Sequence, residues 1–336
     1  MNPFTLVRLP TLDAARERVA AEPERRSFRA GGIDLIDRMK EGLDAPDELV
    51  ELAAISGEHG ARMRGIVSTE DGGWRIGALV TLGQIAGFDD LPTAYGALKE
   101  AAGNAATPSI RNGATAGGNL LQRPRCWYFR HSDLLCLKKG GYECLAVSGD
   151  NRYNAILGGG PSFIVHPSSL GSALVALDAS VTIAGNDGLR SMPIEQLFAL
   201  PTVDPTREHT LADGEVLVSI ELPPALAGQR SAYHFAKEKQ SQDWPLAEAS
   251  VRCTVEGGVM REVRVGLGHV APIPWRSKEA EDALEGVAPS AEAFAKAAEA
   301  ALSVAKPLEG NAYKVPLSQG VLRYALHYAT STPLPG

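Results

Sequence analysis

The sequence has few cysteines, no long apolar run and no excess of basic residues, and each scarcity excludes a class of protein. Four cysteines among 336 residues are too few for a disulfide scaffold, which favours a reducing compartment. No apolar run approaches the roughly 18 residues that indicate a membrane span. With 33 basic and 40 acidic residues the net charge is -7, which argues against nucleic acid or an anionic membrane as the partner.

Length and composition predict an ordinary globular protein of several parts. A chain of 336 residues exceeds the size at which one hydrophobic core usually stops growing, so two or three subdomains are expected. The hydrophobic content of 44% and the charged content of 22% are those of a soluble globular protein. Residues 1–8 lack the charged segment, apolar core and cleavage site of an export signal, which predicts a cytoplasmic location.

Apolar spacing and turn residues divide the chain into three parts. Residues 1–58 predict a small βαβ unit, with a helix at 12–21 capped by Thr11, strands at 27–30 and 49–55, and Asp34 capping the helix between them. Residues 59–225 predict a hairpin and further helices and strands: 63–67, 74–77, 82–86, 91–102, 171–177, 180–184 and 215–222. Residues 226–336 predict three antiparallel strands followed by three helices: 232–237, 247–255, 259–267, 277–284, 290–305 and 317–328. Strands followed by helices indicate an α+β unit.

One glycine motif matches the pattern of a dinucleotide-binding loop, but the residues that follow it argue against such a loop. Residues 266–271 fit G-x-G-x-x-A, the fingerprint of Rossmann dinucleotide-binding domains. That fingerprint requires a helix that starts within the loop, so that its amides meet a pyrophosphate. Pro272 and Pro274 disfavour such a helix, because proline lacks an N–H and restricts the residue before it. The Rossmann interpretation is therefore rejected.

Two other glycine turns, residues 30–32 and 115–119, are better candidates for a pyrophosphate site. A pyrophosphate needs several converging N–H donors and a close approach of the backbone, which side chains would obstruct. Thr115 and Asn119 can add hydrogen bonds from their side chains. The alternative is that both segments are ordinary turns.

Three of the four cysteines, Cys126, Cys136 and Cys144, lie within one short stretch beside the second glycine turn. Thiolates are ligands for iron–sulfur clusters and zinc. Structural zinc sites usually contain C-x-x-C pairs, which are absent here, although His131 can complete a three-cysteine set. The intervals of ten and eight residues fit an irregular loop around a larger cluster better, and the remaining alternative is three buried apolar thiols. Cys253 lies in a predicted strand and is expected in the core.

Basic residues near these cysteines favour the thiolate form, because a positive charge lowers the pKa of a thiol. They are Arg125, Arg130, Lys138 and Lys139. A backbone anion site beside a thiol cluster indicates two neighbouring cofactors, an arrangement suited to electron transfer.

Five segments carry a resemblance to a known family: residues 28–35, 75–78, 111–122, 125–144 and 166–168. In these segments the chain resembles the FAD-binding medium subunit of the xanthine dehydrogenase (molybdenum hydroxylase) family. It is especially similar to the subunit of bacterial periplasmic aldehyde oxidoreductases that carries an additional iron–sulfur cluster. The resemblance covers essentially the whole chain.

The resemblance implies an α+β fold with an FAD-binding domain of the p-cresol methylhydroxylase type. Residues 1–58 and 59–225 would form its two subdomains, with a cysteine-rich insertion at 122–165, and residues 226–336 would form a C-terminal domain of antiparallel sheet and helices. The implied FAD-binding residues are Ser27, Phe28, Arg29, Ala30, Gly31, Gly32, Ile33, Asp34, Leu35, Thr115, Gly118, Asn119 and Lys237. For Lys237, a solvated lysine is the alternative.

The resemblance also implies a [4Fe–4S] cluster held by Cys126, Cys136, Cys144 and the residue at position 162, which here is serine. A serine alkoxide is a harder ligand than a thiolate and more difficult to deprotonate. Two further departures are Ile33 in place of a threonine, which removes one hydroxyl donor but leaves the backbone amide, and Ser169 in place of an aspartate, which leaves one polar contact with the cofactor open.

The implied function is that of an electron-transfer subunit with no catalytic residue of its own. In the family, a large subunit with a molybdenum cofactor oxidises an aldehyde or N-heterocycle, and a small subunit with two [2Fe–2S] clusters relays electrons. The FAD subunit of such a heterotrimer passes them to an external acceptor. The alternatives are a free-standing FAD oxidase or dehydrogenase and a zinc-stabilised scaffold without redox function. For the location, the alternative is the periplasm, reached by co-export with a signal-bearing partner.

Overall fold

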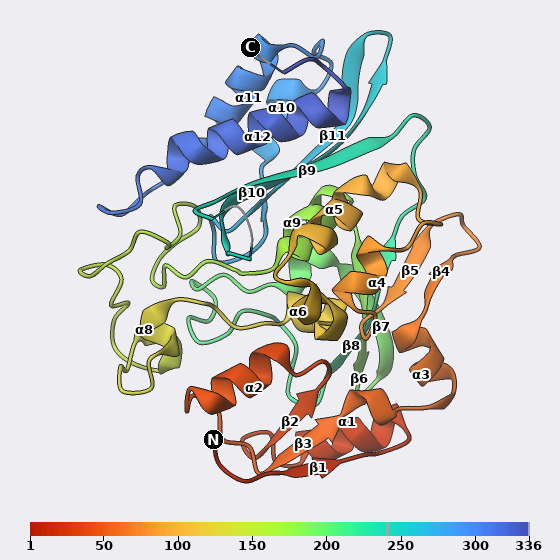
Figure 1. Ribbon diagram of the computed structural model, residues 1–336, viewed down its shortest axis with the longest axis vertical. Helices are drawn as coiled ribbons and strands as arrows, with labels where there is room; N and C mark the ends of the chain where they lie inside the picture. Colours follow the sequence, from red (N-terminus) through yellow and green to blue (C-terminus); the bar gives the residue numbers. More distant parts are fainter. Residues whose placement is uncertain (240–241, 335–336) are drawn as a thin grey trace.

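The computed structural model describes residues 1–239 and 242–334, and its helices and strands form three parts stacked along the long axis of the molecule (Figure 1). The N-terminal part lies at one end, the C-terminal sheet and its helices lie at the other, and the middle part lies between them. The predicted α+β class is confirmed by this mixture of helices and largely antiparallel sheets.

The N-terminal part is built on a parallel three-stranded sheet of order β1-β3-β2. Its elements are β1 (Thr5–Val7), α1 (Leu12–Ala20), β2 (Arg26–Arg29), α2 (Ile33–Lys40) and β3 (Glu48–Glu51). The predicted βαβ unit is therefore confirmed as β2-α2-β3. The predicted cap of α1 is also confirmed, since the Thr11 hydroxyl accepts from the Ala14 amide at 3.3 Å.

The prediction that Asp34 caps α2 is wrong. The helix begins two residues earlier than that cap would place it, with Gly32 as its N-cap, and the φ of 76° at Gly32 lies in the left-handed region that glycine adopts without a steric penalty. Asp34 lies in the first turn of the helix, and its carboxylate faces arginine side chains instead of the helix amides.

The middle part contains an antiparallel five-stranded sheet of order β4-β5-β8-β6-β7. Its elements are α3 (Gly57–Arg64), β4 (Ile66–Ser68), β5 (Trp74–Gly77), α4 (Leu82–Ala86), α5 (Gly96–Asn104), α6 (Pro108–Gly113), α7 (Ala116–Leu120), α8 (Trp127–Arg130), α9 (Ser169–Ala176), β6 (Ser180–Gly185), β7 (Gly188–Pro193) and β8 (Val216–Leu222). The predicted hairpin is present as β4 and β5, although Met63 belongs to α3. The sequence does not predict β7, because this edge strand is largely exposed and carries little apolar pattern.

The C-terminal part is an antiparallel four-stranded sheet of order β12-β11-β10-β9, followed by three helices. Its elements are β9 (Arg230–Lys237), β10 (Pro245–Glu256), β11 (Val259–Gly268), β12 (Trp275–Arg276), α10 (Lys278–Leu284), α11 (Ala291–Leu302) and α12 (Lys314–Thr330). In the part of the chain that the structure describes, the element that follows β11 is the short strand β12 and not a helix, which agrees with rejection of the Rossmann interpretation of that loop.

The central strand β10 is buried on both faces. Helix α12 packs on β9 and β10 from one side, and α5 and α9 of the middle part pack on the sheet from the other side (Figure 1). Where α9 crosses β11, a Cβ added at Gly266 would overlap the carbonyl oxygen of Ser172. The two parts are thus in backbone contact at this point.

Within residues 1–239 and 242–334, no helix combines the length and the apolar character that crossing a bilayer requires.

We expect Gly266→Ala to lower the free energy of unfolding by roughly 1–3 kcal/mol, because the added methyl group separates β11 from α9. Gly320→Ala is the matched control, since its Cβ would meet no atom within 4 Å in the middle of α12, where alanine is the better helix former. Urea unfolding of both variants provides the measurement. Equal stability of the two variants would contradict the proposed backbone contact.

Candidate functional site

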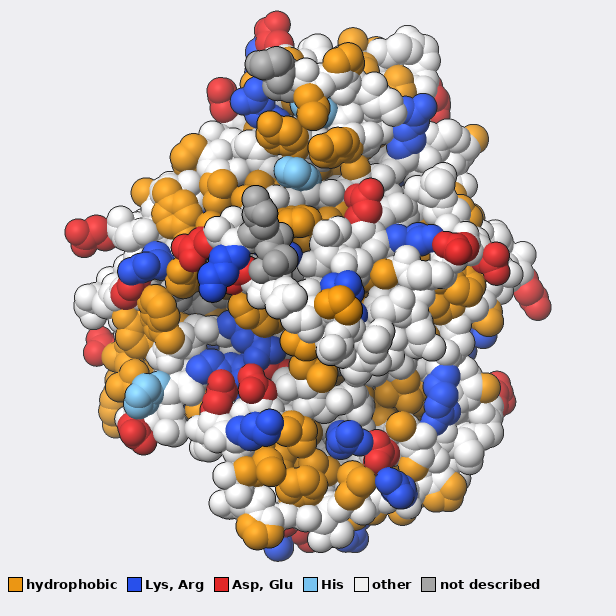
Figure 2. All heavy atoms as spheres, in the orientation of Figure 1, with side chains coloured by type: hydrophobic (Ala, Val, Ile, Leu, Met, Phe, Trp, Pro, Cys, Tyr) orange, Lys and Arg blue, Asp and Glu red, His pale blue; other side chains and the backbone are white. Residues whose placement is uncertain are grey.

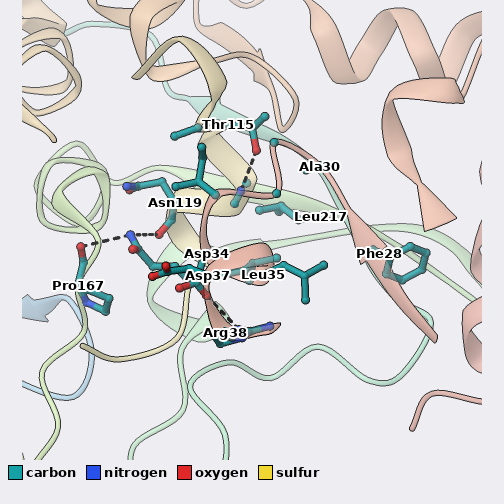
Figure 3. A pocket seen from close by; sticks show the side chains of 18 of the residues that line it. Phe28, Ala30, Asp34, Leu35, Asp37, Arg38, Thr115, Asn119, Pro167 and Leu217 are labelled. Atoms are coloured by element: carbon teal, nitrogen blue, oxygen red, sulfur yellow. Dashed lines mark hydrogen bonds and ion pairs between the residues drawn. The ribbon is translucent and has the colours of Figure 1, made fainter. Parts of the chain in front are cut away.

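A cavity of about 910 Å³ lies between the three parts of the molecule, and both predicted glycine turns line it (Figure 3). Ala30, Gly31 and Gly32 line it from the N-terminal part, and Thr115 and Gly118 line it from the middle part. Its volume is at the upper end of the range of roughly 300–1,000 Å³ for small-molecule sites. The cavity is therefore large enough for a cofactor.

The first glycine turn directs the start of α2 at the cavity. Gly32 is the N-cap of this eight-residue helix, and no side chain caps it. The first amides of a helix have no partner within the helix and mark the positive end of its dipole, so this end can receive an anion. Gly31 is required for another reason: a Cβ there would overlap the carbonyl oxygen of Gly113, so the chain segments before α2 and α7 touch through their backbones.

The second glycine turn is held by its own polar side chains. The Thr115 hydroxyl oxygen accepts from the Gly118 amide at 3.1 Å, which leaves the hydroxyl hydrogen free to be donated. Asn119 Oδ1 accepts from the Ser168 hydroxyl at 2.7 Å and from the Leu170 amide at 3.4 Å. These bonds fix α7 against the start of α9.

Most of the predicted cofactor-binding residues line this one cavity. Those that do are Ser27, Phe28, Ala30, Gly31, Gly32, Ile33, Asp34, Leu35, Thr115, Gly118 and Asn119. Arg29 and Lys237 are not among the lining residues. Arg29 pairs with Glu51, whereas Lys237 Nζ donates to the Asn104 carbonyl at 2.9 Å and lies 4.4 Å from the centre of the Phe235 ring.

Sequence reasoning missed a charged cluster around Asp34 at the cavity wall. The Asp34 carboxylate accepts hydrogen bonds from Arg130 at 2.6 Å, from Arg38 at 3.0 Å and from the Arg123 amide at 3.0 Å, and it forms an ion pair with Arg125 at 2.9 Å. Burial alone would raise the pKa of Asp34, but the arginine charges hold it below its ordinary value. Figure 2 shows basic and acidic side chains gathered in a hollow on this face of the molecule.

Arg125 also connects this cluster with the C-terminal part. Its guanidinium carbon lies 4.9 Å from the ring centre of Trp244, a cation–π contact across the cavity, and both residues line it. Trp244 directly precedes β10. No signal within either local sequence pairs two residues so far apart in the chain.

The structure does not support the predicted [4Fe–4S] cluster or the zinc alternative. Among the residues described, no group of three or more His, Cys, Asp or Glu side chains is placed to hold a metal ion. Cys126, Cys136 and Cys144 are free thiols, and Ser162, proposed as the fourth ligand, is buried. Burial raises the pKa of Cys126, which opposes the thiolate form.

The basic residues near the cysteines have other partners in the fold. Arg125 and Arg130 pair with Asp34, and Lys138 Nζ lies 3.0 Å from Glu208 Oε1. Lys139 Nζ donates to the His131 carbonyl. In the sequence these basic residues lie beside the thiols. In the fold, three of them pair with carboxylates that are distant in sequence, and Lys139 donates to a backbone carbonyl group.

A buried carboxyl group lies behind one wall of the cavity. Glu248 Oε1 accepts from the Ser169 hydroxyl at 2.6 Å and from the Tyr233 hydroxyl at 2.5 Å, and His269 Nε2 lies 3.6 Å from it. Burial raises the pKa of Glu248 to about 7, although the two hydroxyl donors partly oppose that rise. Ser169 itself lines the cavity, so this acid is one side chain away from whatever occupies it.

Family models match nearly the whole chain. Residues 2–225 match the FAD binding domain in molybdopterin dehydrogenase, and residues 231–329 match the CO dehydrogenase flavoprotein C-terminal domain. The chain is 34% identical to the aldehyde oxidoreductase FAD-binding subunit PaoB of Escherichia coli K12 over 284 residues, which cover 84% of this chain and 86% of that protein.

Carbon monoxide dehydrogenases provide further similarity. The medium chain from Hydrogenophaga pseudoflava is 26% identical over 305 residues, covering 89% of this chain and 88% of the relative. In a solved structure of carbon monoxide dehydrogenase from that organism, one chain superimposes with a TM-score of 0.76 and 25% identity, covering 98% of both chains. The predicted order of an FAD-binding domain and a C-terminal domain is thereby confirmed.

We expect Asp34→Asn to lower the free energy of unfolding by roughly 2–4 kcal/mol at neutral pH, because three arginine side chains lose their shared carboxylate. Asp37→Asn on the same helix is the control, since this side chain is 52% exposed and its contacts with arginine are 3.4 Å or longer. Chemical denaturation measures both. If Asp37→Asn is as destabilising as Asp34→Asn, the cluster is not centred on Asp34.

Glu248 makes stability depend on pH in a defined direction. Since its folded-state pKa is raised from 4.5 to about 7, its protonation stabilises the folded chain fully below about pH 4.5, and this contribution is lost as the pH rises through about 7. The stability of the wild type relative to Glu248→Gln should therefore fall by up to roughly 3 kcal/mol over this interval. Unfolding titrations at several pH values measure that difference. The exposed Glu238→Gln is the control, and a pH-independent difference for Glu248→Gln would contradict the assignment.

Proposed function

The chain belongs to the FAD-binding subunits of the xanthine dehydrogenase and carbon monoxide dehydrogenase family of oxidoreductases, and we propose that it binds FAD in the cavity between its glycine turns and acts as an electron-transfer subunit. Substrate oxidation in this family takes place on partner chains. The observation that carries the proposal is the convergence of both glycine turns and the uncapped start of α2 on a single cavity.

The residues around the cavity fit the chemical parts of FAD. The start of α2, with the amides that follow Gly32, suits a diphosphate, and the Thr115 hydroxyl has a hydrogen left to donate to it. Phe28 and Leu35 supply apolar walls. Bound FAD supplies the redox chemistry, while the protein positions it and tunes its potential through hydrogen bonds and nearby charge.

The partners follow from family membership and from the names of the relatives, which are subunits or medium chains. In the proposed heterotrimer, a large subunit with a molybdenum cofactor oxidises an aldehyde or N-heterocycle, and a small subunit with [2Fe–2S] clusters relays the electrons. This chain receives them and delivers them to an external acceptor. The complex is placed in the cytoplasm; co-export into the periplasm with a signal-bearing partner is the alternative, and cell fractionation distinguishes the two.

A flavin-binding titration tests the proposal. The purified chain should take up FAD and show flavin absorption, and Gly31→Ala should weaken FAD binding at least about tenfold, because its Cβ forces the two glycine turns apart. Gly103→Ala in α5 should bind like the wild type, since its Cβ would make an ordinary 3.6 Å contact with Ala86. A chain that stays colourless with excess FAD would refute the function.

The same preparation discriminates between the remaining alternatives. The isolated chain with FAD should not oxidise aldehydes or N-heterocycles until the partner subunits are added; turnover by the isolated chain would identify a free-standing oxidase or dehydrogenase. The metal content of the purified chain tests the two metal sites that the cysteines suggested. Stoichiometric iron would support the iron–sulfur cluster, and stoichiometric zinc would support the zinc site.

A further inference from the structure

Glu248 lies in β10, whose first residue, Pro245, lines the cavity, and it is hydrogen-bonded to Ser169, which also lines the cavity. Its side chain is fully buried, and both of its hydroxyl donors, Ser169 and Tyr233, contact the same oxygen, Oε1. The other oxygen, Oε2, has no hydrogen-bond partner within the described chain. It packs so closely on Gly268 that a Cβ there would overlap it, so the carboxyl group is held in one orientation.

Within residues 1–239 and 242–334, no lysine or arginine forms an ion pair with this carboxyl group, and Lys237 acts on it only from a distance. The polar and titratable residues that face it come from each neighbouring element: Ser169 and Ser172 from α9, Tyr233 and Lys237 from β9, and His269 after β11. Behind them, Glu100 of α5 accepts from the Tyr233 amide, and Lys314 of α12 donates to the His269 carbonyl. Lys237 is directed at the Asn104 carbonyl, and burial lowers the pKa of His269 to about 3 and so keeps it neutral. Binding a proton is therefore the direct way to neutralise Glu248.

The protonation state of Glu248 determines what the Ser169 hydroxyl offers to the cavity. When Glu248 is ionised, Ser169, a residue that lines the cavity, donates its only hydrogen to Oε1, so its hydroxyl has only lone pairs left for a bound molecule. When Glu248 is protonated, the proton is best placed on Oε1, since Oε2 has no partner to accept it. The acid then donates to Ser169 Oγ while Tyr233 still donates to Oε1, and the Ser169 hydrogen becomes available to a molecule bound in the cavity.

We infer that Glu248 is a positioning residue for bound FAD, which acts by switching Ser169 between hydrogen-bond donor and acceptor at the cavity wall. The inference rests on the proposed function. FAD is rich in acceptor atoms, namely its phosphate oxygens, ring carbonyl oxygens and imine nitrogens. The donor form of Ser169 is the better match, so FAD binds more tightly when Glu248 carries its proton.

The experiment measures the dissociation constant of FAD at pH values about two units below and above 7 for four chains. In the wild type, the dissociation constant should rise roughly threefold to tenfold with pH, the effect of one net hydrogen bond. Glu248→Gln and Ser169→Ala should lose this pH dependence. Glu238→Gln, the control at an exposed carboxylate next to β9, should behave like the wild type.

Tyr233→Phe separates this mechanism from a purely structural role. Removing the other donor to Oε1 destabilises the ionised acid, so the step in FAD affinity should move to higher pH with its amplitude retained. A purely structural defect would instead weaken binding equally at every pH. An unchanged step in Glu248→Gln, or affinity independent of pH in the wild type, would overturn the inference.

A second readout separates failure of the inference from failure of the proposed function. The infrared carbonyl band of a protonated carboxylic acid should be present below pH 7 in the chain without flavin, should disappear above it, and should be missing in Glu248→Gln. If FAD does not bind at any pH, the proposed function is refuted, and so is the role of Glu248 in FAD binding. A titrating carbonyl band would then still show that Glu248 gains and loses a proton. If FAD binds but the band does not titrate, only the inference fails.

Discussion

The carboxylate of Asp34 is the interaction on which the arrangement of this molecule most depends. It lies in the first turn of α2, immediately after the glycine turn that faces the cavity, and it gathers arginines from its own helix and from the insertion. Through Arg125 and Trp244 the same cluster reaches the start of β10. One partly buried acid therefore connects the helix that faces the cavity with all three parts of the chain.

This interaction also shows what the sequence could and could not predict. The elements whose signals are local were predictable, such as α1 with its Thr11 cap and the β2-α2-β3 unit. The residues that line the cavity from both glycine turns were found because backbone approach to a pyrophosphate demands glycine in recognisable places. Gly31 adds a reason that local sequence does not contain, which is its contact with the backbone of Gly113.

The errors arose where partners are distant in sequence. The basic residues around the cysteines read locally as support for thiolates, yet their charges belong to Asp34 and Glu208 in the fold. The sequence also did not predict the partner of Ser169, whose hydroxyl donates to Glu248, 79 residues further along the chain. Tertiary pairing of charges and hydroxyl groups carries information that spacing within a segment does not.

The contact between Gly266 and Ser172 has a consequence for how the polypeptide can be divided. The match to the FAD-binding domain ends at residue 225, and the match to the C-terminal domain begins at residue 231, which suggests two modules that could be separated there. However, the C-terminal sheet leaves one face to be covered by α5 and α9, which precede that point in the chain. A fragment cut at the junction would expose this apolar face to water, so each module depends on the other for a complete core and the two fold as one unit.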